Sequence, residues 1–153
     1  MRISYVEADG LMKIQLVGDL DERAEEPIDQ MRSKATAQVL HFDCGGVDRV
    51  NSFGVRAWLG FFATLKGRTV EFHRLPMVMI DYGNVLPRFL SFGKVMSFAV
   101  PLHCEACDLD EVRVVAVAQA MRDGLAKIPC VKCKKPLELT VKESAYTAFL
   151  KPS

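Results

Sequence analysis

The residues with the clearest chemical potential are four cysteines in the C-terminal third of the chain, arranged as two pairs. Cys104 and Cys107 form the first pair and Cys130 and Cys133 the second, and each pair encloses two residues. Two such C-x-x-C pairs provide four thiolates, which complete the tetrahedral shell that zinc adopts at structural sites. This shell leaves no position for water or substrate, so we predict one structural Zn²⁺ and no metal catalysis.

Three other interpretations of these cysteines stay open: two disulfides, a redox-active C-x-x-C motif, or unrelated buried thiols. The first ten residues include Glu7 and Asp9 where a signal peptide would be apolar. No apolar run approaches the ~18 residues that a membrane span needs. We therefore expect a cytoplasmic protein without membrane insertion, whose thiols stay reduced, and this favours zinc over disulfides.

The charge of the chain disfavours nucleic acid as its main partner. The 20 basic and 19 acidic side chains leave a net charge of +1 over 153 residues, whereas phosphate-neutralising proteins are strongly basic. Lys132, Lys134 and Lys135 form a small basic patch beside the second cysteine pair. Acidic side chains adjoin the first pair: Glu105, Asp108, Asp110 and Glu111. A nucleic-acid-binding ribbon is thus a minor alternative.

Hydrophobic periodicity before the cysteines alternates between strands and helices, which predicts an α/β fold with a mixed β-sheet. The expected strands are 3–6, 11–17, 38–42, 47–51, 69–73 and 95–100, and the expected helices are 22–35, 53–65 and 76–84. Asp9-Gly10 predicts a tight hairpin turn after the first strand. We expect residues 43–46 to form a glycine-rich turn.

The remainder of the chain, about 50 residues, is too short to rely on its own apolar core. Residues 111–118 have strand character, and Gly124 would allow the chain to return as a hairpin. We therefore divide the chain into an α/β domain, 1–100, and a small zinc-ribbon-like β domain, 101–153, stabilised by metal.

One stretch in the first part has a recognisable pattern. Asp43-Cys44-Gly45-Gly46-Val47 follows a buried strand, and Asn51-Ser52-Phe53-Gly54 opens the next helix. With Val17-Gly18-Asp19-Leu20-Asp21, these segments resemble the STAS domain family of anti-sigma factor antagonists. In that family Asp-Ser-Ser-Gly stands at the start of the helix. The resemblance covers roughly residues 1–100 and implies a STAS-like mixed sheet with helices.

The resemblance implies a regulatory function through a protein partner. STAS proteins bind a partner, often an anti-sigma factor with serine kinase activity, and are controlled by phosphorylation of the first serine of the motif, here Ser52. A helix N-terminus tolerates phosphate locally because of its free N–H groups and partial positive charge. The alternative is that Asn51 and Ser52 stand there for helix capping alone.

The helix after Ser52 is apolar over more than one face. Phe53, Ala57 and Phe61 extend its apolar surface beyond the core-facing stripe. A protein partner, a second copy of the chain in a homodimer, or the cysteine-rich tail could cover this surface. The residues we expect at the partner interface are Asp43, Asn51, Ser52, Phe53, Trp58 and Phe61.

Catalytic motifs are lacking in the sequence. The histidines, His41, His73 and His103, do not belong to a nucleophile motif, and no P-loop, G-x-S-x-G or G-x-G-x-x-G occurs. We interpret His41 as a satisfied strand histidine. The sequence therefore predicts a non-catalytic regulatory protein, with a constitutive structural subunit of a larger assembly as the alternative.

Overall fold

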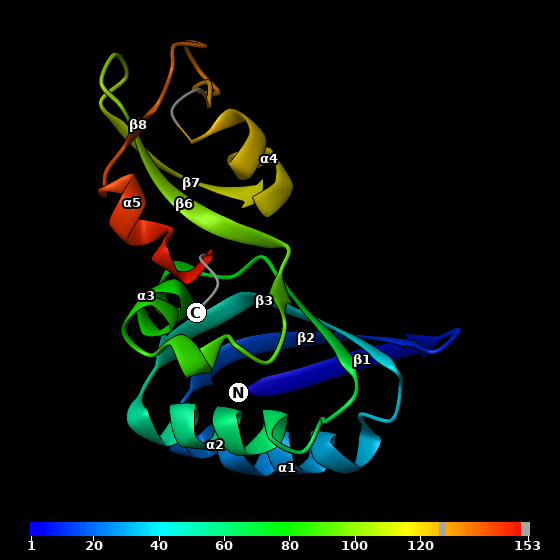
Figure 1. Ribbon diagram of the computed structural model, residues 1–153. Coiled ribbons are helices and arrows are strands. Elements are labelled where there is room, and N and C mark those ends of the chain that lie inside the picture. Colours follow the sequence, from blue (N-terminus) through cyan, green and yellow to red (C-terminus); the bar gives the residue numbers. More distant parts are fainter. Residues whose placement is uncertain (126–127, 151–153) are drawn as a thin grey trace.

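The chain forms two consecutive β-sheets in the computed structural model, which describes residues 1–125 and 128–150 (Figure 1). The first sheet has the strand order β1-β2-β3-β4-β5, and the second has the order β7-β6-β8. In the first sheet β1 is antiparallel to β2, and the other neighbours are parallel. The predicted α/β class with a mixed sheet, followed by a small β subdomain, is confirmed.

The first sheet and its helices follow the predicted order closely. Its strands are β1 (Arg2–Ala8), β2 (Leu11–Leu20), β3 (Val39–Val50), β4 (Thr69–His73) and β5 (Lys94–Val95). Its helical segments are η1 (Glu22–Ala24), α1 (Glu25–Lys34), α2 (Ser52–Phe62), α3 (Met77–Val85) and η2 (Pro87–Phe89). Asp9 and Gly10 both have positive φ, 51° and 76°, which is the backbone of a two-residue hairpin turn.

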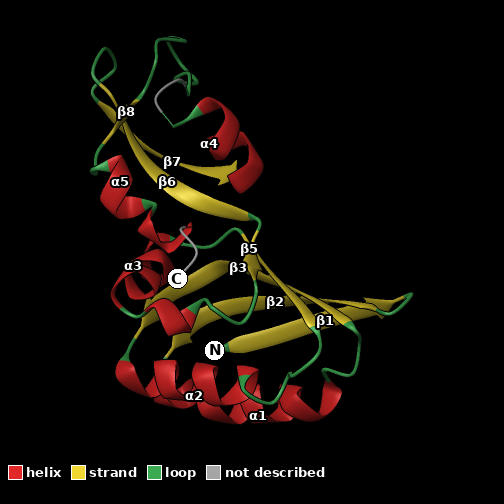
Figure 2. Cartoon of the chain, in the orientation of Figure 1, coloured by secondary structure: helices red, strands yellow, loops and turns green. Residues whose placement is uncertain are grey.

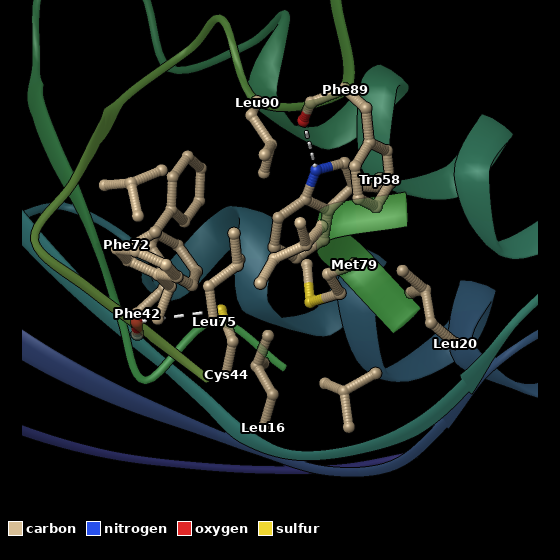
Figure 3. Packing of buried hydrophobic residues seen from close by; sticks show 14 of the residues in the cluster. Leu16, Leu20, Phe42, Cys44, Trp58, Phe72, Leu75, Met79, Phe89 and Leu90 are labelled. Carbon is tan, nitrogen blue, oxygen red and sulfur yellow. Dashed lines mark hydrogen bonds between the residues drawn. The ribbon is translucent and has the colours of Figure 1, made fainter. Parts of the chain in front are cut away.

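Helices α1 and α2 cover one face of this sheet (Figure 2). Alternate residues of β3, including Phe42 and Cys44, point into this layer and are buried. The Phe42 and Phe62 rings lie 5.1 Å apart, centroid to centroid. The Trp58 indole N–H donates to the Phe89 carbonyl at 2.9 Å (Figure 3), so the polar atom of this buried side chain is satisfied.

The glycine-rich turn expected at 43–46 is wrong, because β3 runs through these residues without interruption. Gln15 pairs with Asp43 and Val17 with Gly46, so β3 carries one extra residue there as a β-bulge. A Cβ on Gly46 would lie 2.7 Å from the Leu16 carbonyl oxygen. This glycine therefore permits close strand packing and does not make a turn.

The strand expected at 95–100 is divided between the two sheets. Val95 ends β5 in the first sheet, whereas β6 (Ser97–Cys104) begins the second. The second sheet also contains β7 (Leu109–Ala116) and β8 (Glu138–Leu139), with α4 (Val117–Asp123), α5 (Glu143–Tyr146) and η3 (Ala148–Leu150) around it. Gly124, with φ 70°, follows α4, so the hairpin return expected at this glycine is wrong. The division into domains at residue 100 stays a prediction.

The last described residues return to the first part of the chain and pack on α3 (Figure 1). The Asn84 amide donates to the Tyr146 carbonyl at 3.0 Å and accepts from the Phe149 N–H at 2.8 Å. The Tyr146 hydroxyl donates to the Ala99 carbonyl at 2.7 Å. Among the described residues, no helix has both the length and the apolar character that a membrane span requires.

Two glycines of α2 differ in the space that the structure leaves for a side chain. A Cβ on Gly54 would overlap the Leu20 carbonyl and crowd the Asp21 nitrogen, whereas a Cβ on Gly60 would meet no atom within 4 Å. We expect Gly54→Ala to lower the free energy of unfolding by about 1–3 kcal/mol or more, because a backbone group must move. Gly60→Ala should raise it by about 0.5–1 kcal/mol, because alanine favours the helix.

Urea denaturation of the two variants measures this difference directly. Equal midpoints for the two variants would contradict the close contact between α2 and the end of β2.

Candidate functional site

The four predicted cysteines meet at the end of the second sheet that is remote from α3. The Sγ atoms of Cys104, Cys107, Cys130 and Cys133 all lie within 4.8 Å of one another, and all five cysteines of the chain are free thiols. The Cys104 and Cys133 sulfurs are 3.5 Å apart. Thiolates bound at about 2.3 Å to one tetrahedral ion would lie about 3.8 Å apart. The cluster could therefore hold a metal ion.

Two turns of similar local geometry present these thiols. The Cys107 N–H donates to the Cys104 carbonyl at 3.3 Å in the turn between β6 and β7, and the Lys134 N–H donates to the Cys130 carbonyl at 3.1 Å. Asp108 and Lys134, which directly follow the second cysteine of each pair, have positive φ of 48° and 64°. Each C-x-x-C pair is thus a tight turn that directs both sulfurs to the same point.

The Cys107 and Cys133 thiols differ in acidity. A hydrogen bond from the Lys135 backbone lowers the pKa of Cys133 to about 7. A hydrogen bond with Cys133, together with burial, raises the pKa of Cys107 to about 12. Thiols placed this close cannot all ionise unless a cation lies between them, and a metal ion bound by the four sulfurs would be such a cation. His103 lies nearby but is hydrogen-bonded to Asp110 at 2.8 Å, and it is not part of the cluster.

The second predicted site, at the start of α2, is organised by Asn51. The Asn51 Oδ1 accepts from the N–H groups of Phe53 and Gly54, both at 3.0 Å, and its Nδ2 donates to Glu22 at 3.0 Å. Asn51 is therefore the N-cap, and Ser52 is the exposed first residue of the helix. Of the pair expected to cap this helix, Asn51 provides the cap.

An exposed apolar side chain follows Ser52. Phe53 is 54% exposed, and the Arg56 guanidinium carbon lies 5.7 Å from the centre of its ring. Between α1 and α2 is a shallow hollow of about 250 Å³, lined by Glu25, Asp29, Arg32, Phe53, Arg56, Ala57 and Gly60. Its lining combines apolar with charged side chains, respectively Phe53 and Ala57, and Glu25, Asp29, Arg32 and Arg56.

The other residues expected at a partner interface do not join this surface. Trp58 and Phe61 are only 2% and 3% exposed, because their face of α2 packs on the aromatic residues of the sheet, and the expectation that they contact a partner is wrong. Asp43 lies on the opposite sheet face, where Arg74 donates to its carboxylate at 2.8 and 2.6 Å. Burial alone would raise the pKa of Asp43, but these hydrogen bonds outweigh it and lower the pKa.

One further cluster of side chains is not apparent in the sequence. His41, Glu71 and His73 lie side by side on β3 and β4, on the sheet face that α1 and α2 leave open. His41 is distant along the chain from Glu71 and His73, and the register of two parallel strands brings it beside them.

Comparisons with known proteins give a structural likeness alone. No family model matches the chain, and no curated protein matches it. Among solved structures, one that matches is the anti-sigma factor antagonist SpoIIAA in its unphosphorylated form, with 18% identity and a TM-score of 0.37. This match covers 46% of the present chain and 71% of the other.

Capping by Asn51 has a measurable consequence. We expect Asn51→Ala to lower the free energy of unfolding by about 1 kcal/mol, because two helix N–H groups lose their acceptor. Ser52→Ala should change it by less than about 0.5 kcal/mol, because the side chain is exposed at the surface. Thermal and urea denaturation of both variants, measured beside the parent, compares them; a larger loss for Ser52→Ala would mean that the cap is misassigned.

Proposed function

We propose that this chain is a non-catalytic, cytoplasmic regulatory protein of STAS type, which binds a protein partner and is switched by phosphorylation of Ser52. The observation that carries the proposal is that Ser52 is exposed at the start of α2 while Asn51 does the capping. The serine is accessible to a kinase, and its hydroxyl is not needed to hold the helix.

The surroundings of Ser52 support a phosphate switch. A phosphate there gains from the helix dipole and adds roughly −1.5 to −2 charges. Arg56 stands four residues later, on the same side of α2, and lies over the Phe53 ring. A phosphate would draw Arg56 away from this ring, so charge and apolar surface would change together at the hollow between α1 and α2. A partner bound there would be released.

The partner we propose is an anti-sigma factor with serine kinase activity, or a protein of that class, which contacts Phe53 and the adjacent hollow. The alternative of a constitutive structural subunit would use the helix face around Trp58 and Phe61 for assembly, and both side chains lie in the core of the chain itself. This burial favours the switch over the constitutive subunit.

We further propose that the cysteine cluster holds one structural Zn²⁺ and that the C-terminal part is a zinc ribbon. Four convergent sulfurs from two tight turns support this assignment, since such a donor set is typical of closed zinc sites. Bound zinc would stabilise the turns that carry these cysteines and leave no open position for chemistry.

The switch is tested by partner binding. We expect Ser52→Ala to retain the partner in affinity purification from the native cells. Ser52→Asp should retain a roughly tenfold smaller amount of partner, because of its added negative charge. Ser91→Asp, an exposed serine in the loop before β5, controls for charge alone and should retain the partner.

Phosphopeptide mapping of the native protein completes this test. Phosphate on the Ser52 peptide is the expected result. Equal binding by the alanine and aspartate variants would exclude the switch.

Zinc is tested by metal content. We expect one equivalent of thiolate-bound Zn²⁺ per reduced chain, lost in Cys130→Ser and retained in Cys44→Ala, because Cys44 is a buried thiol outside the cluster. A strong chelator should raise amide exchange in the β6–β7 turn while β1–β4 stay protected. Substoichiometric metal in carefully reduced protein would refute the zinc ribbon.

A further inference from the structure

A second cluster of metal-ligand side chains lies on the open face of the first sheet, away from the cysteines and from Ser52. In the parallel pairing of β3 with β4, His41 stands opposite Glu71 and Asp43 opposite His73. Alternate residues of a strand share a face, so His41, Glu71 and His73 project from the same side.

Three donor atoms converge in this cluster. The His41 Nε2 lies 3.1 Å from the Glu71 Oε2, and the His73 Nε2 lies 3.1 Å from the same oxygen. One donor atom from each of the three side chains lies within 4.8 Å of the others. An ion that binds nitrogen and oxygen at about 2.0–2.2 Å places its donors about 3.0–3.5 Å apart. The observed spacing therefore suits a shared ion after small side-chain movements.

The setting of the cluster also suits a metal. The three side chains are partly exposed, 25% for His41, 23% for Glu71 and 34% for His73, so each is partly shielded from water and still accessible to an ion. The neighbouring Arg74 guanidinium donates hydrogen bonds to both carboxylate oxygens of Asp43. Its positive charge is therefore paired with the negative charge of Asp43.

The cluster opens onto a groove, which gives an ion room for further ligands. His41 and His73 line a groove of about 600 Å³ together with Tyr5, Lys13, Gln15 and other residues of β1 and β2. Two imidazoles and one carboxylate are the protein donors of many zinc and non-haem iron sites that keep open positions. A closed thiolate site has no such opening.

We propose that His41, Glu71 and His73 form a second metal site, which binds a divalent transition-metal ion such as Zn²⁺ or Co²⁺ and leaves coordination positions free toward the groove. The competing explanation of the same contacts is a pair of neutral imidazoles that each donate an Nε2–H to the shared Glu71 oxygen. In a metal site the same Nε2 atoms carry no proton and face the ion, so metal binding distinguishes the two explanations.

Cobalt titration of the full chain tests the proposal, starting from protein whose cysteine cluster is already loaded with one equivalent of Zn²⁺. We expect a further equivalent of Co²⁺ to bind without the intense thiolate-to-cobalt absorption that sulfur ligands produce. In NMR spectra it should broaden the ring signals of His41 and His73 and leave those of His103 sharp.

Single substitutions identify the ligands. His41→Ala, His73→Ala and Glu71→Gln should each weaken Co²⁺ binding at least roughly tenfold, since even outer-shell substitutions cost that much at metal sites. His103→Ala is the matched control, because His103 pairs with Asp110 outside the cluster, and it should bind like the parent. Thermal denaturation without added cobalt checks that every variant is folded.

Two results would overturn the second site. One is cobalt binding that is unchanged by all three substitutions, and the other is binding that follows His103 instead. The Cys130→Ser variant separates this proposal from the zinc ribbon, because it should lose the thiolate-bound metal and still bind cobalt at the histidines.

Discussion

The arrangement of the two sheets depends on the burial of Phe98. This residue stands near the start of β6, is fully buried, and forms a parallel β-bridge to Leu75, which lies between β4 and α3. Its ring lies 5.5 Å from that of Phe149, so the C-terminal segment closes over it. These contacts join three distant segments in one apolar core. The second sheet is therefore held to the first by side-chain packing as well as by the covalent chain.

The first sheet carries different chemistry on its two faces. Side chains directed toward α1 and α2 are large and aromatic, as for Phe42 and Phe72, and their burial holds α2 against the strands. The intervening residues of the same strands, His41, Asp43 and His73, are polar and line a groove. The alternation of a strand thus lets the same segments build a core and a candidate binding surface without mutual interference.

Much of the fold could be predicted because local signals agreed with tertiary packing. Asp9-Gly10 suits only a tight turn between two strands, and strand 69–73 was predicted with its observed bounds. Glycine was the ambiguous signal. Gly45 and Gly46 permit close contacts with Arg74 and β2 inside a continuous strand, and sequence alone does not distinguish this use of glycine from a turn.

The sequence by itself determined the two C-x-x-C turns, because each is a local motif, and their spacing predicted that the four thiols meet. It also determined that Ser52 begins a helix. The tertiary structure alone decided that Trp58 and Phe61 are buried while Phe53 is exposed. It also brought His41, Glu71 and His73 together. The physical reason is that turns and helix starts depend on neighbouring residues, whereas helix rotation and parallel-strand register depend on contacts between distant segments.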